Sequence, residues 1–153
     1  MDVNGFKGPN SEARNGKQYD IRSFKVAKFS KGCAGNEIKG IGCVYELPSY
    51  SYLDTTKEEN KKYDSYQRPS NAWAGAKKAC DDIGMSLPDK SKLLSLAKLP
   101  TAEKERLGLP TSGWFWSSSE YYALRAYGVT FYGGGTGNDF KGNSNFKVLC
   151  VGD

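Results

Sequence analysis

The chain has 153 residues, the size of one ordinary domain with a buried core. Aromatic residues make up 13% of it, which argues against a disordered protein, and no apolar run is long enough to cross a bilayer. Histidine is absent, which excludes imidazole acid–base catalysis, the usual serine and cysteine triads and most zinc and copper sites. The net charge of +5 comes from lysines and arginines scattered among acids before residue 111, so nucleic-acid binding is not expected.

The first part of the chain is rich in turns and polar residues. Residues 2–18 contain Asn-Gly and Gly-Pro turns, and residues 19–29 alternate partly between apolar and polar side chains, which predicts a strand. Residues 51–70 predict an exposed loop with at most one turn of helix. Asp2, Asn4 and Gly5 resemble the start of a calcium loop, but the later acidic ligands are missing, so we expect no metal.

The cysteines indicate the compartment. The chain has four of them without a CxxC spacing, which disfavours a zinc site: Cys33, Cys43, Cys80 and Cys150. An even number favours two disulfides and an extracellular location, whereas four free thiols would indicate a cytosolic protein. Three pairings are possible. Glycines around Cys33 and Cys43 favour closure of that short loop, which would leave Cys80 for Cys150.

Two helices are predicted in the middle of the chain. The first begins at Ser70 or Asn71, ends at Gly84, and has apolar side chains three and four residues apart, at Trp73, Ala76, Cys80 and Ile83. The second follows Asp89, which can cap it, with an inner face made of Leu93, Leu96 and Ala97. Residues 101–107 predict one further short helical turn.

The chain after Gly113 predicts three or four short antiparallel strands with glycine- and asparagine-rich turns. Val148 and Cys150 would face inward on the last strand, which brings Cys150 to the inward-facing Cys80. Five aromatic residues are expected in the core: Trp114, Trp116, Tyr127, Phe131 and Phe146. The predicted fold class is α+β.

The order of these motifs resembles the C-type lectin-like fold. The pattern is W-x-x-A-x-x-x-C-x-x-x-G-x-x-L-P from Trp73, a leucine-rich helix, F-W-S-S-S-E from Phe115, A-Y-x-V-x-F from Ala126 and V-x-C-V from Val148. The resemblance covers residues 68–153 and implies a lectin-like domain there. It also implies a disulfide between the first helix and the last strand, which matches Cys80 and Cys150.

Within that fold, the C-terminal part most resembles the variable proteins of diversity-generating retroelements, which keep F-W-S-S-S and V-x-C-V and vary between them. The resemblance implies a diversified ligand-binding surface, and tyrosine and arginine are typical of binding hot spots. The expected ligand-binding residues are Tyr121, Tyr122, Leu124, Arg125, Thr130, Tyr132, Asn138, Asp139, Phe140, Asn143 and Asn145.

The motifs D-V-N-G-F-K-G-P-N from Asp2 and Y-D-I-R-S-F from Tyr19 are similar to the globular part of some bacterial type IV pilin-like proteins. We therefore group residues 1–67, with the predicted strand and the Cys33 loop, as a pilin-like segment. Those proteins reach the membrane through an apolar N-terminal helix, which is missing from this sequence. The expected function is adhesion on a bacterial surface or pilus, toward an unknown protein or glycan on another cell, a phage or a host. The alternative is a structural minor pilin or pseudopilin that packs against other pilin subunits.

An enzyme is not expected. The formylglycine-generating oxidases share the lectin-like fold but need a reactive cysteine pair, and only Cys150 lies in the corresponding part of the chain. The acidic pairs at Asp81-Asp82 and Glu58-Glu59 are typical of solvated surfaces. Calcium-dependent lectins use E-P-N or Q-P-D followed by W-N-D, and neither motif occurs. We therefore expect no cofactor and no calcium-dependent sugar site.

Overall fold

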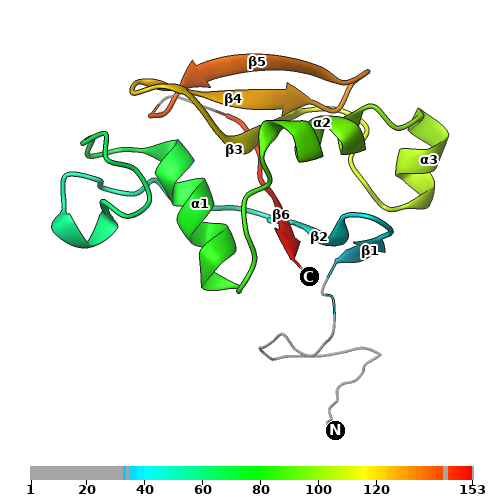
Figure 1. Cartoon of the computed structure of the whole chain (residues 1–153), viewed down its shortest axis with the longest axis horizontal. Helices are drawn as coiled ribbons and strands as arrows, with labels where there is room; N and C mark the ends of the chain where they lie inside the picture. Colours follow the sequence, from blue (N-terminus) through cyan, green and yellow to red (C-terminus); the bar gives the residue numbers. More distant parts are fainter. Residues whose placement is uncertain (1–32, 34, 143–144, 153) are drawn as a thin grey trace, which may run out of the picture. The chain divides into compact units, whose positions relative to one another are not determined.

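The computed structural model describes residues 33, 35–142 and 145–152 (Figure 1). The chain divides into two units at Gly35, and the elements described here belong to Asn36–Asp153. They are, in order, β1 (Asn36–Ile38), β2 (Gly42–Glu46), η1 (Glu58–Asn60), α1 (Ala72–Asp82), α2 (Lys90–Ala97), α3 (Thr101–Arg106), β3 (Trp114–Tyr122), β4 (Arg125–Thr130), β5 (Gly135–Phe140) and β6 (Leu149–Gly152). This combination confirms the α+β class. The strand predicted over residues 19–29 lies outside the described residues.

The strands form two antiparallel sheets, β1-β2-β6 and β3-β4-β5. The second sheet is the predicted C-terminal hairpin region. Figure 1 shows it lying across one side of the unit, with α1 and α2 beneath it. The pairing of β6 with β2 instead of with its neighbours in sequence places residues 42–46 in the same unit as the C-terminus.

Both major helices begin at the residues that the sequence indicates. The Asn71 side chain accepts a hydrogen bond from the Ala74 N–H at the start of α1, and Asp89 accepts one from the Lys92 N–H at the start of α2. Each cap satisfies an N–H group that has no partner within its own helix. Within the described residues, no helix is long and apolar enough to cross a membrane.

A wide bulge interrupts β3. Trp116 pairs with Gly128 and Glu120 with Ala126, so four residues of β3 span what two residues of β4 span. The extra residues bind the helical layer. The Ser117 carbonyl accepts a hydrogen bond from the Trp73 indole N–H at 2.7 Å, and the Ser119 hydroxyl accepts one from the Lys90 N–H at 2.9 Å. The serine run thus docks α1 and the start of α2 against the sheet.

Two clusters of buried side chains form the core. One joins α2 to the sheets through Leu93, Leu96, Phe115, Val129 and Phe131. The other joins α1 to β3 and β6 through Trp73, Cys80, Trp116, Val148 and Cys150. Every side chain in these two lists is buried.

Three of the aromatic residues expected in the core are not fully buried. Tyr127 and Phe146 are half-buried, and Trp114 is 38% exposed. The Trp114 ring stacks on Phe146 with 5.5 Å between centroids and lies over Gly137, where a Cβ would be 3.0 Å from it. The prediction for Trp114 was wrong: Gly137 has no side chain, so the Trp114 ring packs over it on the outer surface of the sheet.

The disulfides agree with the predicted set. Cys80 in α1 is bonded to Cys150 in β6, with 5.4 Å between their Cα atoms. Cys33 and Cys43 are also disulfide-bonded, and no cysteine is free. Two disulfides are consistent with an extracellular protein.

Residues 51–70 differ from the predicted exposed loop. η1 is the expected helical turn, but Thr55 and Asp64 are buried. Thr55 Oγ1 accepts a hydrogen bond from the Arg68 N–H at 3.0 Å, and Asp64 accepts one from the Asn71 side chain at 2.9 Å. The loop is therefore attached to the start of α1 through polar side chains.

Candidate functional site

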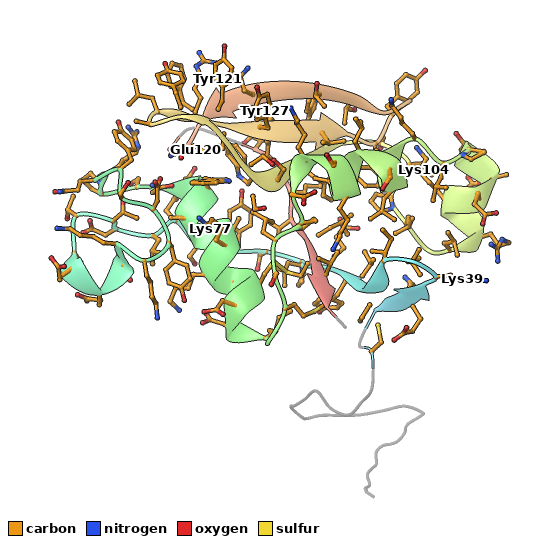
Figure 2. All side chains as sticks on the ribbon, in the orientation of Figure 1. Lys39, Lys77, Lys104, Glu120, Tyr121 and Tyr127 are labelled. Atoms are coloured by element: carbon orange, nitrogen blue, oxygen red, sulfur yellow. A yellow bond between two sulfur atoms is a disulfide. The ribbon has the colours of Figure 1, made fainter. Side chains whose placement is uncertain are left out.

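Aromatic and cationic side chains, some exposed and some half-buried, gather where β3 ends and β4 begins. We define the aromatic face as Lys90, Tyr121, Tyr122, Arg125, Tyr127, Asn138 and Phe140. Tyr121, Tyr122 and Phe140 are 51%, 47% and 41% exposed. Figure 2 labels Tyr121 and Tyr127 beside this end of the sheet. Large exposed apolar side chains that lie together are typical of binding sites.

The tyrosines of the aromatic face are packed on one another. Tyr121 meets Tyr127 edge to face, with 5.3 Å between centroids and 77° between planes, and meets Tyr122 at 5.5 Å and 74°. The Lys90 ammonium lies 3.9 Å from the centroid of the Tyr127 ring. Edge-to-face pairs and cation–π contacts are favourable arrangements, so these rings are ordered before any ligand arrives.

Arg125 is held in a similar way. Its guanidinium carbon lies 3.9 Å from the Phe140 ring centroid, and its Nη1 donates a hydrogen bond to Asn138 Oδ1 at 2.8 Å. These contacts follow from the register, in which Arg125 faces Phe140 and Tyr127 faces Asn138 across β4 and β5. A guanidinium has five N–H donors, and among the described residues one of those of Arg125 is bonded, to Asn138.

Five of the residues predicted from sequence meet in the aromatic face: Tyr121, Tyr122, Arg125, Asn138 and Phe140. The others lie elsewhere. Tyr132 is 81% exposed but lies beyond the opposite end of β4. Thr130 and Asp139 are half-buried and alternate onto the other side of the sheet. Leu124 is half-buried in the β3–β4 turn, Asn145 is exposed, and Asn143 lies outside the described residues.

Two members of the aromatic face were missed from the sequence. The sequence predicts Tyr127 in the core because it alternates in step with Val129, but only Val129 is buried. Lys90 belongs to α2, and nothing in the sequence indicates that the first residue of that helix reaches β4. The feature of the sequence that did indicate this site is the pair of adjacent tyrosines, Tyr121 and Tyr122.

A family model matches residues 55–152, and its description is a domain of unknown function, DUF8780. The chain belongs to the DUF8780 family. No curated protein and no solved structure matches the chain. The matched range contains both major helices, the β3-β4-β5 sheet and the aromatic face of this DUF8780 protein.

Beneath the aromatic face, the DUF8780 protein holds a buried cation. Lys141 has no exposed side-chain surface, and its ammonium contacts Asp64 and Glu120. Its backbone N–H donates to the Leu124 carbonyl, and its carbonyl accepts from the N–H groups of Ala72 and Trp73 at the start of α1. Nearby, burial lowers the pKa of the Lys77 amine, and Asp64 opposes that change. This region connects β5, the β3–β4 turn and α1.

A separate cavity of about 370 Å³ lies between the segment after β2 and the segment before β6. It is lined by Glu46, Leu47, Pro48, Ser49, Tyr50, Phe146, Lys147 and Val148. The Tyr50 hydroxyl donates to the Phe146 carbonyl at 2.6 Å and accepts from the Trp116 indole N–H at 3.1 Å, and burial raises the pKa of Tyr50. No member of the aromatic face lines this cavity. Among the described residues, no group of acidic or cysteine side chains could hold a metal ion.

Proposed function

We propose that this DUF8780 protein is an extracellular bacterial binding protein that presents its aromatic face to a protein on another surface. The observation that carries the proposal is the prepacked set of exposed tyrosines beside a stacked arginine. Tyrosine and arginine contribute large contact area and many hydrogen bonds, and ordering them beforehand lowers the entropy lost on binding. Tyrosine and arginine are enriched at the hot spots of protein–protein interfaces, so we expect a protein partner.

The proposal includes a C-type lectin-like fold for residues 68–153 and diversification of the exposed positions. Its support is the order of two helices followed by short strands, with a disulfide from the first helix to the last strand. Tyr121, Tyr122 and Phe140 belong to neither buried cluster. Exchange of these side chains would change the contact surface at small cost to folding, which is what a diversified site requires.

Adhesion of coated beads tests the function. Beads coated with the wild-type protein, and beads coated with the double variant Tyr121→Ser, Arg125→Ser, would be incubated with panels of bacterial and host cells. The number of beads that adhere to each cell type would then be compared between the two proteins. Loss of one hot-spot side chain lowers affinity by about 30-fold. Tyr52→Ser is the matched control, because Tyr52 is 55% exposed and lies on the loop before α1. Equal adhesion by wild type and double variant would contradict the proposal.

Two further observations separate adhesion from a structural pilus role. If the protein is an adhesin, cells that express the double variant should assemble pili normally but lose binding to the partner cells. Failed assembly with unchanged binding would favour the minor pilin instead. Diversification predicts a reverse transcriptase gene beside this gene and a near-identical copy of its 3′ end that differs at adenines, and DNA without them would remove that part of the proposal.

A further inference from the structure

Lys141, Asp64 and Glu120 form a triad that the proposed function does not use. The Lys141 nitrogen lies 3.2 Å and 3.1 Å from the two carboxylate oxygens of Asp64, and 2.5 Å from Glu120 Oε2. The residues come from three places, directly after β5, the loop after η1 and the end of β3. Figure 2 labels Glu120 beside the N-terminal end of α1.

The geometry brings a nucleophile to a carboxyl group. Because the Lys141 nitrogen is almost equally distant from the two Asp64 oxygens, it lies beside the whole carboxyl group and close to the carbon that joins the oxygens. Reacting atoms held about 3–3.5 Å apart gain an effective concentration of roughly 10⁵–10⁸ M over free reactants. An amine and a carboxyl group that do not condense in water can do so under such confinement.

The surroundings of the pair are poor in water. The side chain of Lys141 is fully buried and that of Asp64 is 3% exposed. The Trp73 and Tyr66 rings lie 4.4 Å and 5.7 Å from the ammonium. Loss of hydration makes this buried ion pair costly, and its conversion to a neutral amide removes that cost.

Glu120 supplies the third role. Its carboxylate is in contact with the amine, so it can take the amine proton and return it to the leaving oxygen, as a general base and then a general acid. Its side chain is 46% exposed, which gives the released water a route to solvent. The triad therefore contains a nucleophile, an acyl group and a proton carrier.

We propose that Lys141 and Asp64 join in an intramolecular amide bond, with Glu120 as the proton carrier. The bond from Lys141 Nζ to Asp64 Cγ forms, one Cγ–O bond of Asp64 breaks, and one water leaves with two protons from the amine and the acid. Starting from the ammonium and the carboxylate, the products are a neutral amide and water, so charge and atoms balance. No oxidant, metal or second substrate takes part. The cross-link ties residues 77 positions apart in the sequence.

The intact mass of the folded, unreduced protein tests this proposal. Wild type is expected one water lighter than the chain with its two disulfides. After digestion, trypsin should fail to cut at Lys141, and residues 63–77 should be recovered joined to residues 126–147. The exposed pair Lys78–Asp82, at 2.8 Å and with no second ion-pair partner for the lysine among the described residues, is an internal control that should stay unlinked.

Three variants assign the roles. Lys141→Arg keeps the charge without the amine and should have the full mass. Glu120→Gln should also keep the full mass, with formation of the Cys80–Cys150 disulfide showing that it has folded. Asp64→Asn should lose ammonia in place of water and so reach the same final mass as wild type. A folded wild-type protein at its full mass would overturn the proposal, and so would a water loss that maps to other residues.

Discussion

Gly75 in α1 shows how a single residue is constrained by its neighbours. A Cβ at this position would lie 2.0 Å from the Ser51 carbonyl oxygen, well inside contact distance. The helix therefore packs directly against the backbone of the preceding loop. In an isolated helix, replacement of glycine by alanine stabilises by about 1 kcal/mol.

For Gly75→Ala we expect the opposite sign. The methyl group must displace the loop, which should lower the free energy of unfolding by about 1–3 kcal/mol. Urea unfolding measures the change, with Lys78→Ala on the exposed side of the same helix as the control, expected within about 0.5 kcal/mol of wild type. A more stable Gly75→Ala protein would show that the loop does not press on α1.

Tyr63 gives a prediction about pH. Its hydroxyl donates a hydrogen bond to Asp81 at 2.6 Å, and this bond to the carboxylate raises the pKa of Tyr63 from 10.0 to about 12. Because the folded state holds this proton more tightly than the unfolded state, the contribution is present below pH 10 and is lost as the pH rises toward 12. In an ultraviolet titration, the tyrosine ionisation that is absent from Tyr63→Phe should occur at a higher pH than that of a free tyrosine. In Asp81→Asn, the same ionisation should occur at a lower pH than in the wild type.

Residue roles were the hardest to predict from sequence. Lysine is usually exposed, so Lys141 and Lys104 counted only toward the net charge, yet both are buried. The Lys104 ammonium donates to the carbonyls of Ala97 and Phe131, at 2.8 Å and 2.6 Å. These partners are distant in sequence, and no local pattern indicates them. The exposed tyrosines Tyr121 and Tyr122 were predictable because they are adjacent in the sequence and therefore lie close together in any fold.

At the level of elements, the start of α1 and the start of α2 carry the same kind of cap in different surroundings. Asn71 is fully buried and also donates to Asp64 and Thr55, whereas Asp89 is exposed. Loss of an exposed cap costs about 1 kcal/mol. Loss of a buried one also leaves its other hydrogen-bond partners unsatisfied, at a further cost of about 1–3 kcal/mol.

We therefore expect Asn71→Ala to destabilise the protein by at least about 1 kcal/mol more than Asp89→Ala does. Chemical denaturation of the two variants gives the comparison directly. Equal losses would indicate that the polar contacts between the loop and α1 contribute little to stability.

The helices were predictable as elements because each repeats its apolar residues with a helical period and begins at a residue that can cap it. The three strands of the second sheet were predictable from their turns and alternation. β1 and β2 were missed because they are short and lie among glycines, at Asn36–Ile38 and Gly42–Glu46. The pairing of β6 with β2 joins segments about a hundred residues apart, which alternation within a strand does not reveal.

For the whole molecule, the Cys80–Cys150 disulfide is the main long-range constraint that could be predicted, because the helix and strand periods both turn these residues inward. It closes a segment of 70 residues, for which the loss of chain entropy corresponds to about 4 kcal/mol. The double variant Cys80→Ala, Cys150→Ala should unfold at correspondingly lower denaturant concentration while the slope of unfolding rises little. A loss under 1 kcal/mol would mean that packing of α1 on β6 suffices.

The bulge in β3 has a consequence for how this protein can change over generations. Residues before it, such as Phe115 and Trp116, face the interior, and residues after it, such as Tyr121, belong to the open surface. Because the extra residues interrupt the regular pairing there and the serines anchor that point to the helices, substitutions after the bulge leave the buried residues before it in place. The buried part of β3 before the bulge and the exposed part after it can thus accumulate substitutions at different rates, although they belong to one strand.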